Sequence, residues 1–214
     1  MSLIKFLDLV EFQEIFDFAY KAPAREPRLG HCSMLTGLLV LLFIGFNRIW
    51  HFSYLRLDAM LCGLFNVTQL PVASTFWRYV NTLGINQAHS LLRLMALLRE
   101  RVWQLCDVSY YRICLDGDTT VETVFGNQQG SRKGHNTKYR GKKGYRPVLC
   151  FIEQSREYLL GKLRKGETIS GKQTAAFIAN IYRYLPKCVE QVLIRADAEF
   201  FSWHSIHECS KAGY

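Results

Sequence analysis

The chain has 214 residues, 49% hydrophobic and 21% charged, which is the composition of a globular protein with one or two domains. Its formal charge of +9 is uneven: residues 1–107 carry ten Lys and Arg against eight Asp and Glu, whereas residues 108–214 carry seventeen against ten. The seven cysteines form no CxxC pair, which argues against a disulfide scaffold or zinc ribbon and indicates a reducing, cytoplasmic compartment. The longest apolar run, residues 34–46, is shorter than the about 20 residues of a membrane span, so we expect no membrane association.

The first half of the chain is expected to be entirely helical. Apolar residues recur there at the three- and four-residue spacing of an amphipathic helix. A connector with two prolines, residues 21–30, interrupts this pattern. The predicted helices cover residues 3–20, 33–50, 50–65, 75–83 and 86–106. Together they define an N-terminal all-α domain, residues 1–107, with DNA binding as its expected role.

That role depends on a segment that resembles a helix-turn-helix. A turn around Pro71 is followed by Ser74 or Thr75 as a candidate N-cap and by a short helix that Gly84 ends. The second helix of such a pair can enter the major groove, which makes Arg78 a candidate DNA contact. Alternatively, the two helices only pack against each other.

The pattern changes after residue 107 to short strands and helices in the order β-β-β-α-β-α. Strands are predicted at residues 110–118, 145–153, 157–164 and 191–195, and helices at 173–185 and 202–212. This order is that of an RNase H-like core. The predicted fold class is therefore α+β, with the helical domain followed by an incomplete RNase H-like α/β core over residues 108–214.

Acidic residues follow the first and the fourth strand of this core. Asp116 and Asp118 point to the same side of the first strand, because side chains alternate along a strand. Asp197 follows the fourth strand, which lies beside the first in an RNase H-like sheet, so Asp118 and Asp197 should converge across 79 positions. Convergent carboxylates can hold Mg²⁺ or Mn²⁺ for phosphodiester chemistry, with Asp116 as a supporting ligand and Glu199 in reserve. Alternatively, Asp116 and Asp118 mark a solvated turn and Asp197 is a helix N-cap.

A strongly basic segment, residues 126–147, separates the first two predicted strands and contains no acidic residue. Its glycines and polar residues predict no regular element. Such a segment beside a metal site suits a phosphate backbone, although it is alternatively a solvated disordered loop. The candidate DNA-binding residues in it are Arg132, Lys133, Lys138, Arg140, Lys142, Lys143 and Arg146.

Four motifs together resemble the DDE transposases of bacterial insertion sequences: LDGDTTVETVFGNQQG, KKGYRPVLCFIE, LLGKLRKGETIS and VLIRADAEFF. The segment LPVASTFWRYV in the helical half is also similar to that family. The resemblance implies Mg²⁺-dependent cutting and joining of transposon ends, with DNA as partner and a homodimer in a synaptic complex. It makes Asp118 the first catalytic aspartate, because Thr119, Thr120 and Val121 match the residues after that aspartate in the family motif, and it makes Asp197 the second.

The family's third acid is a glutamate on a helix beyond a further strand. The sequence reaches Tyr214 before that point, and Glu208 comes too early to match it. The expectation is therefore a truncated transposase that is inactive or impaired alone. The alternatives are a non-catalytic DNA-binding protein derived from a decayed insertion element and an unrelated RNase H-like nuclease.

Overall fold

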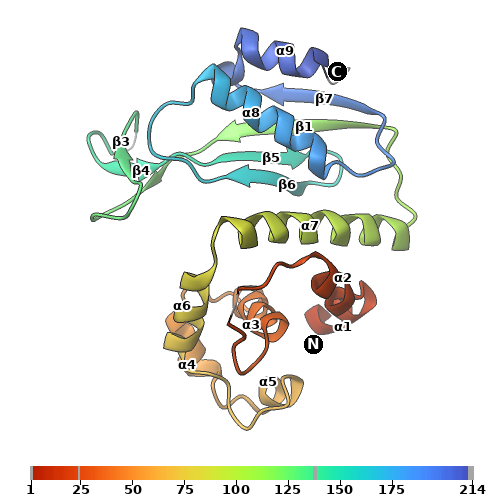
Figure 1. Ribbon diagram of the computed structural model, residues 1–214, viewed down its shortest axis with the longest axis vertical. Helices are drawn as coiled ribbons and strands as arrows, with labels where there is room; N and C mark the ends of the chain where they lie inside the picture. The colour runs from red at the N-terminus through yellow and green to blue at the C-terminus, as the bar shows by residue number, and fades with distance from the viewer. Residues whose placement is uncertain (1, 24, 137–138, 212–214) are drawn as a thin grey trace. The chain divides into compact units, whose positions relative to one another are not determined.

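A computed structural model of the chain describes residues 2–23, 25–136 and 139–211 (Figure 1). Its contacts divide the chain into two compact units, Met1–Val102 and Trp103–Tyr214. In the described ranges, no helix is both long enough and apolar enough to span a bilayer.

The first unit is helical, as predicted, but its helices are more divided than the sequence pattern indicates. The predicted helix at residues 3–20 is broken at Glu11, whose backbone adopts a left-handed conformation with φ of 55°. The predicted helix at residues 50–65 is broken at Asp58, whose Oδ1 accepts a 2.9 Å hydrogen bond from the Leu61 N–H and so caps a new helix. The helices are α1 (Ser2–Leu9), α2 (Phe12–Ala19), α3 (His31–Phe43), η1 (Ile49–His51), α4 (Phe52–Leu55), α5 (Ala59–Leu64), α6 (Ala73–Thr82) and α7 (Ile85–Leu105).

Helix α6 contributes one of its faces to the core of this unit. The Phe76 ring is fully buried and stacks on that of Phe52, with the ring centroids 3.6 Å apart. Tyr79, one turn along the helix, is buried in the same cluster with Met34 of α3. The face with Trp77, 58% exposed, stays open to solvent.

The second unit is built on a four-stranded sheet in the order β6-β5-β1-β7. Strand β1 is antiparallel to β5 and parallel to β7, and β5 is antiparallel to β6. This confirms the predicted element order and is consistent with an RNase H-like core. The elements are β1 (Arg112–Thr119), β5 (Val148–Ile152), β6 (Glu157–Lys162), α8 (Gly171–Ile181), η2 (Tyr182–Tyr184), β7 (Gln191–Ala196), η3 (Ala198–Phe200) and α9 (Trp203–Lys211).

One face of this sheet forms the core of the second unit. Alternate residues of the two central strands point to it and are buried, as the period-two pattern of a half-covered sheet requires. Helix α8 contacts β6 and α9, and buries its own apolar face there (Figure 1). The buried residues are Ile113 and Leu115 of β1, Val148, Cys150 and Ile152 of β5, and Phe177, Ile178 and Ile181 of α8.

The prediction that residues 126–147 contain no regular element was wrong. Strands β3 (Arg132–Lys133) and β4 (Lys143–Tyr145) pair with β2 (Glu122–Thr123) in a second sheet of order β2-β4-β3. The glycines that suggested a loop instead permit close packing of backbones. A Cβ on Gly144 would lie 2.7 Å from the Glu122 carbonyl oxygen, across the β2–β4 pair. Figure 1 shows this small sheet beyond the edge of the main sheet toward which β1 and β7 point.

Candidate active site

Asp118 and Asp197 lie at matching ends of two adjacent parallel strands. The register of β1 and β7 pairs Asp116 with Arg195 and Gly117 with Ala196. Asp118 and Asp197 are the next residues along the chain from the last of these pairs, and both are exposed. The strand order thus brings to one edge of the sheet two carboxylates that lie 79 positions apart in the sequence.

Each of these carboxylates is held by a nearby backbone N–H. Asp118 Oδ1 accepts a 2.7 Å hydrogen bond from the Thr119 N–H. Asp197 Oδ1 accepts a 3.0 Å bond from the Glu199 N–H and caps η3. Asp197 is therefore an N-cap, as the alternative interpretation of the sequence expected. Among the described residues nothing donates to Oδ2 of either aspartate, so capping leaves one oxygen on each available to a ligand.

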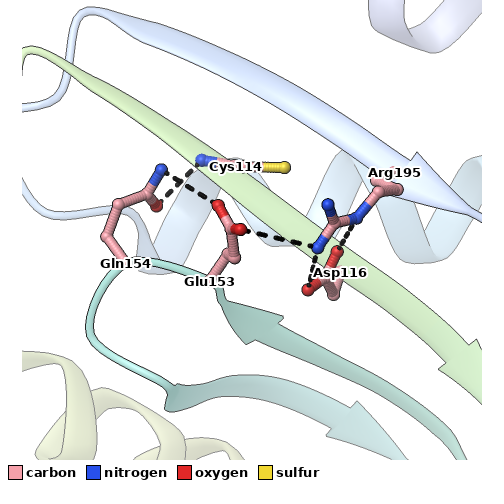
Figure 2. Close-up of polar contacts among 5 residues, drawn as sticks. All are labelled: Cys114, Asp116, Glu153, Gln154 and Arg195. Atoms are coloured by element: carbon pink, nitrogen blue, oxygen red, sulfur yellow. Dashed lines mark hydrogen bonds and ion pairs between the residues drawn. The ribbon is translucent and has the colours of Figure 1, made fainter.

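Asp116 is paired with an arginine on the neighbouring strand (Figure 2). Arg195 Nε donates to Asp116 Oδ1 over 2.6 Å, and Arg195 Nη2 donates to Oδ2 over 2.8 Å. The hydrogen bonds and charge of Asp116 raise the pKa of the Arg195 guanidinium above its ordinary value. Glu153 Oε1 lies 3.8 Å from Arg195 Nη2 on the other side. Both oxygens of Asp116 are therefore occupied, and a role as metal ligand would require this bidentate pair to open.

Glu199 also has both carboxylate oxygens occupied. Oε2 accepts a 3.0 Å hydrogen bond from Thr119 Oγ1, and Oε1 forms an ion pair with Arg146 Nη2. The Arg146 side chain is only 8% exposed. The sequence placed Arg146 in an open basic loop, but the residue lies in the interior beside the strand ends.

The donor set at these strand ends suits a hard divalent cation. Asp118 and Asp197 offer carboxylate oxygens, which Mg²⁺ and Mn²⁺ prefer over zinc. No cluster of three or more His, Cys, Asp or Glu side chains that could hold a metal forms within residues 2–23, 25–136 and 139–211. The two aspartates are therefore the donors that the described part of the chain supplies at this edge.

The predicted basic residues gather on and beside the small sheet. Lys133 and Lys143 are directly opposite each other on β3 and β4, an arrangement in which like charges repel. Arg140 and Lys142 are exposed nearby. Arg132 is ion-paired with Glu167 at 2.6 Å, and Lys138 lies outside the described residues. A polyanion bound here would relieve the repulsion between the lysines.

In the first unit, Arg78 lines a groove of about 560 Å³ on the exposed face of α6. The connector before α3 forms the opposite wall, with Arg25 and Arg28. Trp77 and Glu26 also line it, so three cations face one anion. Helix α6, the predicted DNA-contacting helix, thus presents a basic, partly aromatic surface.

Comparison with known proteins decides the family. The family described as transposase DDE domain group 1 matches residues 9–214. The chain belongs to this DDE transposase family. One solved structure to which this DDE transposase chain is similar is the "Mos1 transposase paired-end complex with left transposon end", at 10% identity and a TM-score of 0.32. The match covers 90% of this chain and 59% of that one. No curated protein sequence matches the chain.

Two partners of the acidic residues in this DDE transposase chain were not identified from the sequence. The offset of 79 positions that pairs Asp118 with Asp197 also pairs Asp116 with Arg195, so the strand register contained the signal for that ion pair. The contact of Glu199 with Arg146 joins η3 to the segment between β4 and β5, and no sequence period relates them. Only the folded chain shows it.

Proposed function

We propose that this chain acts in DNA transposition by binding transposon-end DNA and cutting and joining phosphodiesters with Mg²⁺ or Mn²⁺. The observation that supports this best is the alignment of Asp118 and Asp197 at the ends of β1 and β7 in a member of a DDE transposase family. We assign both aspartates as catalytic residues and metal ligands. Asp116 is a further candidate ligand, available once Arg195 releases it.

The chain's own residues supply positioning at this edge of the sheet. When bound, Mg²⁺ would activate the attacking oxygen and stabilise the leaving oxygen of the phosphodiester. Asp118 and Asp197 would hold it through the carboxylate oxygens that their backbone contacts leave available. Hydrogen bonds to the other oxygens fix the carboxylates, which favours a single ligand geometry.

Two basic surfaces are proposed to bind the DNA. The small sheet would contact phosphates through Lys133, Arg140, Lys142 and Lys143, and through Arg132 if Glu167 releases it. The small sheet lies beyond the end of the main sheet toward which β1 and β7 point (Figure 1). The α6 groove with Arg78 would contact a separate part of the duplex. Since phosphate contacts orient a protein on DNA without reading its sequence, both surfaces would position the duplex for cleavage. In a transposition complex, two copies of the chain would each hold one transposon end.

Metal-dependent cleavage tests the assignment of the aspartates. The assay measures nicking of transposon-end duplex DNA in Mg²⁺ or Mn²⁺ by the full chain and by Asp118→Asn, Asp197→Asn and Asp116→Asn. We expect low activity from the unmodified chain, because the described residues bring two carboxylates and not three to the site. That activity should be lost in Asp118→Asn and Asp197→Asn. Equal nicking by Asp118→Asn and the unmodified chain would contradict the assignment.

The second candidate is a non-catalytic DNA-binding protein. It is favoured by the absence of a three-residue metal cluster in the described part of the chain. Asp118→Ala separates the two functions when Mn²⁺ binding and DNA binding are measured together. Lost Mn²⁺ binding with unchanged DNA affinity supports the transposase site, whereas unchanged Mn²⁺ binding supports the non-catalytic function.

A further inference from the structure

The Glu199 side chain links the two strand ends that carry the candidate metal ligands. Its Oε2 accepts a 3.0 Å hydrogen bond from the hydroxyl of Thr119, the residue directly after Asp118. Its backbone N–H donates over 3.0 Å to Asp197 Oδ1. One residue therefore contacts the end of β1 through its side chain and Asp197 through its backbone.

Arg146 fixes this side chain from the protein interior. It is ion-paired with Glu199 Oε1, and its own side chain is 8% exposed. Its Nε is buried without a hydrogen-bond partner among the described residues. A buried cation requires a nearby anion, because desolvation penalises an unpaired charge. Glu199 supplies that anion, so withdrawing it toward a metal would leave Arg146 buried with its charge uncompensated.

A second arginine increases this requirement. The Arg146 N–H donates over 3.0 Å to the Arg164 carbonyl oxygen, which places the two residues side by side. Burial and the charge of Arg146 lower the pKa of Arg164, and the charges of Glu167 and Glu199 partly offset this effect. Arg164 Nη2 donates over 2.6 Å to Gln173, a neutral group. Glu199 is ion-paired with Arg146, the more buried member of this pair of cations.

We propose that Glu199 is a positioning residue that holds Asp118 and Asp197 in register for a divalent cation, and is not itself a ligand. The Arg146–Glu199–Thr119 chain of contacts forms a clamp across the two strand ends. The inference rests on the proposed metal site at Asp118 and Asp197. The alternative is that Glu199 is itself a metal ligand, which its ion pair with Arg146 restrains. This alternative predicts the opposite effect of removing Arg146 on metal affinity.

Mn²⁺ binding to the full chain without DNA tests the clamp, measured by calorimetry or by the electron paramagnetic resonance signal of free Mn²⁺. Groups that orient metal ligands typically contribute about 10- to 100-fold to metal affinity. Glu199→Gln should therefore weaken Mn²⁺ binding by about that factor. Thr119→Val keeps the side-chain shape and the Arg146 ion pair, and should weaken binding by a smaller factor. Glu11→Gln is the matched control, because it removes one carboxylate from an ion pair with Arg101 in the first unit and should leave Mn²⁺ affinity unchanged.

Arg146→Gln distinguishes positioning from direct ligation. If Glu199 positions the aspartates, Mn²⁺ binds more weakly to this variant; if Glu199 is a restrained ligand, its release makes Mn²⁺ bind more tightly and overturns the inference. Should Arg146→Gln not fold, Thr119→Val decides, since the ion pair remains in it. A merely structural role would lower the melting temperature of Thr119→Val without metal and leave its Mn²⁺ affinity unchanged, which also overturns the inference.

Asp118→Asn separates this inference from the proposed function. If Asp118→Asn binds Mn²⁺ as the unmodified chain does, the metal site is wrong and the proposed function fails with it. If Asp118→Asn loses binding while Glu199→Gln and Thr119→Val keep it, the site stands and only the clamp is wrong.

Discussion

The salt dependence of DNA binding should report directly on the small sheet β2-β4-β3. We consider the triple variant Lys133→Gln, Arg140→Gln and Lys142→Gln. All three side chains are exposed on or beside the sheet, and none has an ion-pair partner among the described residues. Their replacement should therefore remove phosphate contacts without removing a structural interaction.

The magnitude depends on the number of cations that the structure leaves available. The sequence alone suggested five or more in this segment, but Arg146 is buried with Glu199 and Arg132 is paired with Glu167. Four remain among the described residues of the segment. Each phosphate contact contributes about −0.9 to the slope of log affinity against log salt, so four contribute about −3.6. Raising the salt from about 50 to about 200 mM should therefore lower DNA affinity about 150-fold through these four contacts. With three contacts removed, the remaining one should lower it only about 3.5-fold.

Fluorescence anisotropy of a labelled duplex at four or more salt concentrations measures both slopes. The control is Arg156→Gln, Lys172→Gln and Arg183→Gln, which changes the net charge equally at three exposed positions outside the small sheet. We expect the slope of log affinity against log salt to become less negative by about 2.7 in the first variant. The slope of the control should change much less. Equal slopes for the two variants would show that net charge, and not this sheet, determines binding. That result would refute the assignment of the small sheet as a phosphate-binding surface.

Three further predictions concern stability. Phe76→Ala removes a fully buried ring that stacks on Phe52, and should cost about 3–5 kcal/mol in chemical denaturation of the first unit. Gly166→Ala places a Cβ 2.3 Å from a carbonyl oxygen, and should cost about 1–3 kcal/mol with faster hydrogen exchange in β3 and β4; Gly63→Ala, with no atom within 4 Å of the new Cβ, should not destabilise. Burial raises the pKa of the Cys32 thiol from 9.0 to about 11, so its contribution to stability is complete below pH 9.0 and is lost as the pH rises to about 11. Denaturation at about pH 8 and about pH 10.5 should therefore show a smaller alkaline loss in Cys32→Ala than in the unmodified chain.

The order of the elements could be predicted because each depends mainly on local sequence. The apolar period identified the strands of the main sheet and the helix α8 within a few residues. Helix breaks were harder to predict, because the break at Glu11 depends on a left-handed backbone conformation that no residue type there requires. The small sheet was missed because strands of two or three residues have no measurable period. Its glycines gave a turn signal, but Gly134 and Gly144 instead permit close packing against the backbones of Gly166 and Glu122.

The candidate site was likewise only partly predictable from the sequence. That Asp118 and Asp197 end neighbouring strands could be inferred from element order, because a parallel pair brings the same ends of both strands to one edge. The sequence ranked Asp116 and Glu199 behind these two aspartates as candidate ligands, but it did not show their arginine partners. Their hydrogen-bond partners distinguish the four acids. Asp116 and Glu199 each pair with an arginine and have both oxygens occupied. Asp118 and Asp197 each retain one oxygen without a protein donor in the described chain.

This difference in partners also explains how exposed acids can stay together at one edge. Carboxylates that share a face repel one another, and the repulsion is strongest where solvent is excluded. Arg195 neutralises Asp116 one pleat below the aspartate pair, and Arg146 neutralises Glu199 beside it. The two ligands therefore face only each other's charge, which a divalent cation would cancel. The arginines thus favour a site that carries two negative charges, and removing either one should raise the local negative charge.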